Sequence, residues 1–167
     1  MVIIASSFPE LSFSKLMQVY LEGNLEKARE EYGHYSEYAG LHLAEQDFYQ
    51  YLRECFFSTP GAGYAILEEN GVYRSAVRWE PYLDGLLISA LETAPSERRK
   101  GYGEKLLREV LQHVDAKVYS HVSKKNLPSL AVHKKCGFRI ISERARYLDG
   151  SVNSRAFTLC CEKEDPV

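Results

Sequence analysis

Apolar and polar residues recur along this chain with two different periods. Between residues 11 and 32 the apolar positions follow helical spacing, with a break expected at Gly23-Asn24, and residues 43–57 repeat the pattern. Two runs of strand-like character come next, and the Asn70-Gly71 pair between them predicts a hairpin over residues 64–79. The first half therefore predicts helices followed by a strand hairpin.

The second half predicts strands and helices in alternation. The short apolar run at residues 86–91 is typical of a buried strand, and the segment from Leu106 to Val114 has the apolar stripe of an amphipathic helix. The remaining elements are, in order, a strand at 117–122, a capped helix at 126–138, strands at 138–142 and 155–161 with a turn at Asp149-Gly150 between them, and a charged tail at 162–167. This order predicts an α/β fold.

Length and composition indicate one domain, spanning residues 1–167. With 45% hydrophobic residues the chain can bury a substantial core. No apolar run is long enough to cross a bilayer, and Met1–Ile4 lacks the basic start and long apolar stretch of a signal peptide. The cysteines show no metal-site spacing, so we expect buried or half-buried thiols at Cys55, Cys136, Cys160 and Cys161. These features favour a cytoplasmic protein with no metal and no membrane partner.

The net charge of −2 conceals a segregation along the chain. Residues 1–97 hold 6 Lys or Arg and 15 Asp or Glu, whereas residues 98–139 hold 11 Lys or Arg and only 3 acidic residues. A basic segment suits an anionic ligand, and an acidic half suits a cationic amine that arrives from another side. The alternative is an ordinary solvated surface with charges clustered by chance.

The run Arg98-Arg99-Lys100-Gly101-Tyr102-Gly103 stands between a predicted strand and a predicted helix. A turn of this kind leaves backbone N–H groups at the positive end of a helix dipole, and the two glycines allow a ligand to approach the backbone closely. With three adjacent cations, the run predicts a pyrophosphate cradle. The alternative is a tight strand–helix turn whose cations are simply solvated.

Two motifs together resemble the GNAT acetyltransferase superfamily. The run at residues 98–103 matches Arg/Gln-x-x-Gly-x-Gly/Ala, the coenzyme A pyrophosphate loop, and residues 126–138 are similar to Asn-x-x-Ala/Ser…Tyr-x-x-x-Gly-Phe. The motifs occur in the family order and cover about a third of the chain. The resemblance implies an α/β fold whose central mixed, mostly antiparallel sheet is splayed between two strands and flanked by helices.

The same resemblance implies acetyl-CoA as co-substrate and assigns the residues that bind it. The backbone of Leu91 and Thr93 corresponds to the family stretch that pairs with the pantetheine arm and polarises the thioester carbonyl. Asn126 corresponds to a further contact to that arm. The pyrophosphate is expected on Arg98, Arg99, Lys100, Gly101, Tyr102 and Gly103.

His133 occupies the position where many relatives carry a tyrosine as general acid beside the thioester sulfur. An imidazole can do the same work, because its unperturbed pKa of about 6.5 keeps an N–H available near neutral pH. The alternative is a structural histidine whose ring is held by hydrogen bonds beside the helix end.

The general base is less clear from the sequence. Leu87 and Ser89 occupy positions where some relatives place Glu or His, and neither can accept a proton. Glu92 has the opposite strand parity and is expected to point away. Glu80 and Asp84 are better placed, unless they are only solvated turn carboxylates. We therefore expect deprotonation through a water held by Ser89, with Glu80 completing the relay.

These expectations describe an N-acetyltransferase that moves an acetyl group from acetyl-CoA to the primary amine of a small molecule or of an amino-acid-like or peptide-like acceptor. Five tyrosines between residues 32 and 51 can wall the acceptor pocket or simply pack. A monomer or homodimer is expected. The alternative is a non-catalytic coenzyme A-binding regulatory module. A nucleic-acid partner is not expected, because the chain is acidic overall and no aromatics interleave its cations.

Overall fold

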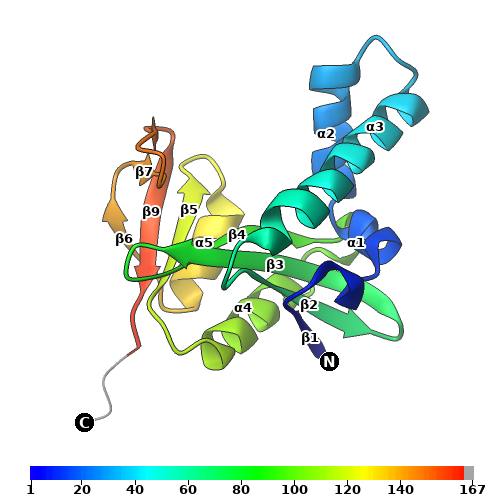
Figure 1. The fold of residues 1–167 in the computed structure, drawn as a ribbon. Helices are drawn as coiled ribbons and strands as arrows, with labels where there is room; N and C mark the ends of the chain where they lie inside the picture. Colours follow the sequence, from blue (N-terminus) through cyan, green and yellow to red (C-terminus); the bar gives the residue numbers. More distant parts are fainter. Residues whose placement is uncertain (164–167) are drawn as a thin grey trace.

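The computed structural model describes residues 1–163, which are built around one seven-stranded sheet. Its strands are β1 (Val2–Ala5), β2 (Gly63–Glu69), β3 (Val72–Tyr82), β4 (Gly85–Thr93), β5 (Val118–Ser123), β6 (Arg139–Ser142) and β9 (Ala156–Cys161). Their order across the sheet is β1-β2-β3-β4-β5-β9-β6, and every neighbouring pair is antiparallel except β4 and β5 (Figure 1). The predicted mixed, mostly antiparallel sheet is confirmed.

Helices cover both faces of this sheet. They are α1 (Phe13–Val19), α2 (Leu21–Tyr32), α3 (Glu37–Gln50), α4 (Tyr102–His113) and α5 (Leu127–Lys135); a π turn (Tyr51–Cys55) and a 3-10 turn (Phe56–Ser58) extend α3, and further 3-10 turns span Phe8–Glu10 and Pro95–Glu97. On one face Leu106, Leu107 and Val110 of α4 pack on the sheet, and on the other Leu16 of α1 and Leu52 of the π turn do so. The two faces therefore have separate apolar clusters.

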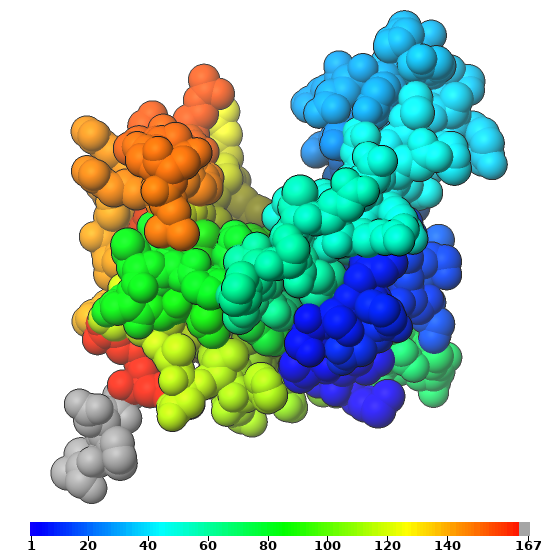
Figure 2. Space-filling view, viewed as in Figure 1, coloured from blue at the N-terminus to red at the C-terminus, as the bar shows by residue number. Residues whose placement is uncertain are grey.

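The α2–α3 helix pair projects away from the sheet. A small hairpin of β7 (Ala145–Arg146) and β8 (Val152–Asn153) projects on the other side of a gap (Figure 1). The space-filling view shows a notch between these two projections (Figure 2). The turn predicted at Asp149-Gly150 joins β7 to β8, and Gly150 has a φ of 86°. The sequence analysis predicted neither of these two-residue strands, nor β1, because such short segments carry no periodicity.

The helix break predicted at Gly23-Asn24 is wrong. The chain bends at Tyr20, and both predicted breakers lie inside α2. The Asn24 side chain is buried and donates a hydrogen bond to Met17 Sδ at 3.4 Å, while the Asn24 backbone N–H donates to the Tyr20 carbonyl. Tertiary packing of the bend therefore outweighs the weak local propensity of glycine and asparagine to end a helix.

The cysteines depart from expectation at one position. Cys136 and Cys160 are buried and Cys161 is half-buried, but Cys55, the last residue of the π turn, is exposed. In the predicted tail, Lys163 forms an ion pair with Asp115, and residues 164–167 lie outside the described part of the chain. Among the described helices, none has the length and apolar character needed to cross a membrane.

Candidate active site

The strands β4 and β5 separate in the middle of the sheet. They pair in parallel only where Leu86–Ile88 lie beside Val118–Ser120. Beyond that point β4 continues to Thr93 paired with β3 alone, and β5 continues to Ser123 paired with β9 alone. Residues 89–93 of β4 therefore have one backbone edge without a neighbouring strand, and an extended ligand can pair with such an edge.

A β-bulge lies at the same place. Ala76 of β3 is opposite Glu92 and Arg78 is opposite Ser89, so that β4 contains one residue more than β3 over this stretch. Ala90 takes up the extra length with a φ of 52°, a left-handed value that is strained for a residue with a Cβ. The bulge bends β4 at the point where it leaves β5.

Two buried tyrosines hold the bulge. The Tyr20 hydroxyl donates to the Ala90 carbonyl at 2.7 Å, and the Tyr64 hydroxyl donates to Tyr20 Oη at 2.8 Å. Burial raises the pKa of Tyr20 well above its usual value, so this hydroxyl keeps its proton and remains a donor. The bend between α1 and α2 places Tyr20 here, and sequence analysis did not single it out.

The bulge also overturns the expectation that Glu92 points away. Parity counted along an unbroken strand puts Glu92 on the face opposite Ser89, but the extra residue reverses the alternation. Glu92 pairs with Ala76 on the face that carries α1, and its side chain lines a cleft beside Glu22 and Glu26. Although the residue is exposed, partial desolvation raises the pKa of its carboxyl, an effect that Arg98 opposes.

This cleft has a volume of about 830 Å³ and runs between the open edge of β4 and the start of α4. Eight of the predicted cofactor residues line it: Leu91, Thr93, Arg98, Arg99, Gly101, Tyr102, Gly103 and Asn126. Lys100 does not line it and instead forms an ion pair with Glu97 at 2.9 Å. The first turns of α2 and α5 complete the walls with Glu22 and Pro128.

The loop before α4 has the conformation of an anion cradle. Arg99 and Gly101 both have left-handed backbones, with φ of 63° and 79°, and Gly101 begins the helix without a side-chain cap. Gly101 has no side chain that could cap the first N–H groups of α4, so these groups remain available to a ligand. A Cβ built on Gly101 would meet nothing within 4 Å, so the space on that side is open to a ligand. The residues present fit a pyrophosphate.

The cations of this loop are partly engaged. Arg98 forms an ion pair with Glu22 of α2, on the opposite wall of the cleft. Arg74 pairs with Glu97 at 2.6 Å, which anchors the 3-10 turn before the loop. Arg99 forms no ion pair within residues 1–163 and lines the cleft. The loop therefore offers backbone amides and one free cation, with a second cation held by α2.

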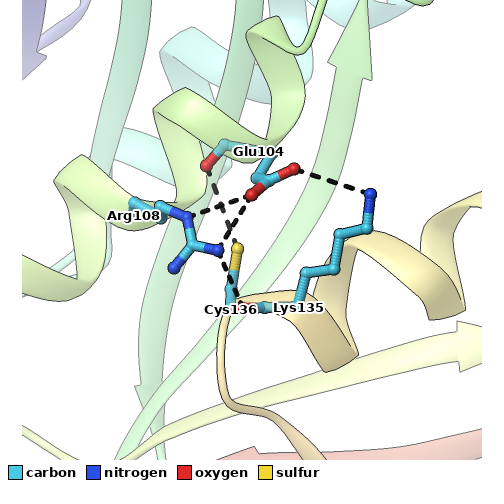
Figure 3. A network of polar contacts seen from close by, with 4 residues as sticks. All are labelled: Glu104, Arg108, Lys135 and Cys136. Atoms are coloured by element: carbon cyan, nitrogen blue, oxygen red, sulfur yellow. Dashed lines mark hydrogen bonds and ion pairs between the residues drawn. The ribbon is translucent and has the colours of Figure 1, made fainter.

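Helix α5 is capped as the sequence predicts. Asn126 Oδ1 accepts a hydrogen bond from the Ser129 backbone N–H at 3.1 Å, and Gly137 follows the helix with a φ of 93°. A network joins the helix end to α4: Arg108 donates to Glu104 Oε1 at 2.8 Å and to the Lys135 carbonyl at 2.9 Å (Figure 3). These contacts keep the two helices that border the cleft in register.

His133 does not line the cleft and is only 2% exposed. Its Nδ1 donates to the Ser129 carbonyl at 2.7 Å, because a carbonyl can only accept; Nε2 therefore accepts from Ser120 Oγ at 2.9 Å. Its ring also meets Phe138 edge-on, at 5.0 Å between ring centroids. Burial lowers the pKa of His133. With both nitrogens engaged, these contacts favour the structural alternative, and the neighbouring Val132 lines the cleft instead.

The other predicted catalytic residues lie on the sheet face away from α4. Ser89 is opposite Arg78, and Glu80 is half-buried opposite Leu87. Neither lines the cleft. Asp84 accepts hydrogen bonds from the Tyr119 hydroxyl at 2.5 Å and from Lys117 at 2.9 Å, and these two bonds lower its pKa. The spacing of the residues does not predict a bulge, so the sequence could not place Glu92 beside this site.

Comparisons with known proteins agree with the geometry. The profile of the acetyltransferase (GNAT) family matches residues 25–138, well over half of the chain. The chain belongs to the GNAT acetyltransferase family and is accordingly a transferase of this class. A comparison with curated protein sequences found no match.

Solved structures share the fold at low sequence identity. The paia N-acetyltransferase from Thermoplasma acidophilum, solved with coenzyme A, is 14% identical with a TM-score of 0.63 over 98% of this chain and 99% of its own. The IAA acetyltransferase from Bacillus cereus ATCC 14579 is 18% identical with a TM-score of 0.60, over 98% and 100%. The aminoglycoside 6'-acetyltransferase type Ii is 14% identical with a TM-score of 0.62, over 98% and 99%. At these identities the likeness establishes the fold alone.

Proposed function

We propose that this chain is an N-acetyltransferase that works as a single domain over residues 1–167, using acetyl-CoA as co-substrate and a primary amine as acceptor. The observation that supports this proposal most strongly is the unpaired edge of β4, which lies beside a left-handed glycine turn at the start of α4. One feature can pair with an extended pantetheine arm, and the other can hold a pyrophosphate. The coenzyme A complex of the paia N-acetyltransferase, which has the same fold, supports the proposal.

The cleft residues divide the binding work. The amides at the start of α4 and Arg99 hold the pyrophosphate, with Arg98 joining them when it leaves Glu22. The backbone of Thr93 pairs with the arm, and the N–H of Leu91 receives the negative charge that develops on the carbonyl oxygen. Asn126 uses its Oδ1 to cap α5 and keeps its side-chain N–H groups for the ligand.

The transfer forms a C–N bond to the acceptor and breaks the C–S bond of the thioester, and the amine must lose a proton. Glu92 is the carboxylate that the bulge brings to the cleft on the face shared with Ser89. We propose that Glu92, directly or through a water on Ser89, takes this proton, in place of Glu80. Its raised pKa suits a general base, because a stronger base accepts the proton more readily.

The test is release of the free coenzyme A thiol from acetyl-CoA in the presence of a panel of amines, with calorimetry of acetyl-CoA binding alongside. Binding together with amine-dependent release supports the proposal. Binding without release from any amine would favour the regulatory-module alternative. The hydrogen bonds on both ring nitrogens of His133 are compatible with that alternative, because they leave this ring no free donor for the thioester sulfur. No heat and no thermal stabilisation at millimolar acetyl-CoA would refute both.

A further inference from the structure

The guanidinium of Arg78 lies half-buried on β3 without an acidic partner among residues 1–163. Its Nη1 is buried and has no hydrogen bond. Burial lowers the pKa of Arg78, but the nearby Tyr64, Tyr20 and Tyr51, together with a hydrogen bond to Tyr64, outweigh burial and the net shift is upward. No carboxylate is among these causes. A cation that is withdrawn from water is normally paired with an anion, and Arg78 has no such partner among the described residues.

Aromatic rings fix the guanidinium in place. The Arg78 Cζ lies 5.1 Å from the ring centroid of Tyr51, 5.7 Å from that of Phe56 and 5.9 Å from that of Phe48. All three rings come from the end of α3 and the turns that follow it. Cation–π contacts of this kind orient an arginine but leave its charge and its N–H groups available for an anion.

The contacts of β3 relate Arg78 to the notch between the α2–α3 pair and the β7–β8 hairpin (Figure 2). On β3, Arg78 contacts the end of α3, and Tyr82 donates a hydrogen bond to the Arg146 carbonyl of β7 at 2.5 Å. The two walls of the notch therefore meet the same strand four residues apart, with Glu80 between them. Arg78 lies on the helix side of this floor.

The position of Arg78 relates the notch to the chemistry. Arg78 is directly opposite Ser89, the last β4 residue before the bulge and the first beyond the segment paired with β5. Neighbouring strands are about 5 Å apart. A group bound at Arg78 is therefore one strand away from the β4–β5 opening, where the acceptor amine must meet the thioester.

We propose that Arg78 binds a carboxylate of the acceptor, so that the substrates are amines that carry a carboxylate, as amino acids do. The proposal rests on the proposed acetyl transfer and narrows its acceptor. The planar guanidinium forms paired hydrogen bonds with a planar carboxylate, which supplies the missing counter-charge. Ser89 and the open edge of β4 then lie beside the amine end of the bound acceptor.

A carboxylate fits this place better than a phosphate. A single negative charge neutralises the single free cation, whereas a phosphate dianion would leave a net negative charge in a partly desolvated site. Glu80, two residues along the same face of β3, would oppose that extra charge. The acceptor anion is therefore distinct in kind from the pyrophosphate that the α4 loop takes on the other side.

The experiment compares acceptors that differ only in the carboxylate. The initial rate of thiol release from acetyl-CoA is measured with L-phenylalanine, L-methionine and L-lysine and with the amide of each, for wild type, Arg78→Met, Arg78→Lys and the control Arg53→Met. Arg53 is an exposed arginine in the neighbouring π turn. The amides have the more acidic ammonium groups, so a preference for the acids cannot come from a larger fraction of free amine.

For wild type we expect kcat/KM for at least one acid to exceed that of its amide by about 100-fold, the scale on which a desolvated charge pair is lost. Arg78→Met should abolish this preference through the acceptor KM and leave the KM of acetyl-CoA within twofold; Arg78→Lys should restore part of it, and Arg53→Met should behave as wild type. Equal use of acids and amides by wild type, or an equal loss for both in Arg78→Met, would overturn the inference.

The inference and the proposed function fail in different ways. If simple amines release thiol while no amino acid does so faster than its amide, acetyl transfer stands and the carboxylate site is wrong. If acetyl-CoA releases no thiol with any amine, the proposed function itself is wrong. Circular dichroism of each variant verifies that a lost preference is not a lost fold.

Discussion

Gly101 combines a left-handed backbone with open space on the side where a Cβ would stand. Gly71 has the same two properties in the β2–β3 turn, with a φ of 75°, and does not line the cleft. Alanine at either position should reduce the free energy of unfolding by about 1 kcal/mol, the cost of a left-handed residue with a Cβ. Only the Gly101 variant should also affect ligand binding.

We therefore predict that Gly101→Ala raises the Kd for acetyl-CoA by about tenfold, because the methyl group occupies the side from which the pyrophosphate approaches. Gly71→Ala should leave the Kd unchanged. Titration calorimetry gives the Kd, and urea unfolding verifies that the two variants are equally destabilised. Equal Kd values for both variants would place the pyrophosphate elsewhere.

Glu92 and Glu80 offer a second matched pair. Glu92→Gln should lower kcat by about 100-fold, within the range that a positioned base contributes, whereas Glu80→Gln should change it less than threefold. Wild-type kcat should fall as the pH drops through the raised pKa of Glu92, because the protonated carboxyl cannot accept the amine proton. A loss confined to Glu80→Gln at unchanged acceptor KM would instead show a dedicated base at Glu80.

His133 is predicted to act on stability. His133→Ala removes two hydrogen bonds and a buried ring, and should lower the free energy of unfolding by about 2–4 kcal/mol. Because burial lowers the folded-state pKa, the unfolded chain binds the proton first. Wild-type stability should thus decline as the pH falls from about 6.5 to the folded-state pKa. A stable alanine variant with turnover reduced ten- to a hundredfold would restore the general-acid role.

At the scale of elements, the sequence predicts what depends on local pattern and misses what depends on packing. The β2–β3 turn forms at Asn70-Gly71 with both residues left-handed, as the dipeptide requires, and α5 has its predicted caps. The bulge at Ala90 has no such sequence signature, because alanine does not favour the left-handed backbone conformation that the bulge requires. Tyr20 holds the bulge from 70 positions away in sequence, and that contact exists only in the folded chain.

The same limit applies to the candidate site. The cofactor loop is a contiguous motif, and the cleft brings most of it together. The proposed acceptor side combines β3, β4 and the end of α3, with Arg78, Ser89 and Tyr51 as its parts. No spacing rule relates these residues, so sequence reasoning proposed a pocket wall of tyrosines without its arginine.

Helix α2 is coupled to the cofactor loop through Glu22 and Arg98. Glu22→Gln frees this arginine for the pyrophosphate and should tighten acetyl-CoA binding by about threefold at low salt, the scale of an exposed ion pair. Glu26→Gln is the control, since Glu26 lines the same cleft from the same helix without an ion pair among the described residues. The difference between the two variants should shrink at 1 M salt, where charges are screened. Weaker binding by Glu22→Gln would show that the pair preorganises the loop.

At the scale of the whole molecule, the cofactor cleft and the notch both lead to the opening between β4 and β5. The cleft is bordered by the first turns of α4, α5 and α2, and the notch lies between the α2–α3 pair and the β7–β8 hairpin (Figure 2). The proposed acetyl-CoA and acceptor would therefore enter by separate routes and could be present together. No cysteine lines the cleft, and the exposed Cys55 lies in the π turn outside it. The arrangement thus favours direct transfer from thioester to amine over transfer through an acylated thiol.

We predict a sequential mechanism with a ternary complex. Double-reciprocal plots of initial rate against acetyl-CoA concentration should intersect as the acceptor concentration is varied, whereas a ping-pong route through an acyl-enzyme gives parallel lines. Alkylation of Cys55 with iodoacetamide should leave kcat within twofold, and Cys55→Ser should match the alkylated protein. Parallel lines, together with an acetylated protein that mass spectrometry detects before the acceptor is added, would show that a side chain carries the acetyl group and that the two approaches are used in turn.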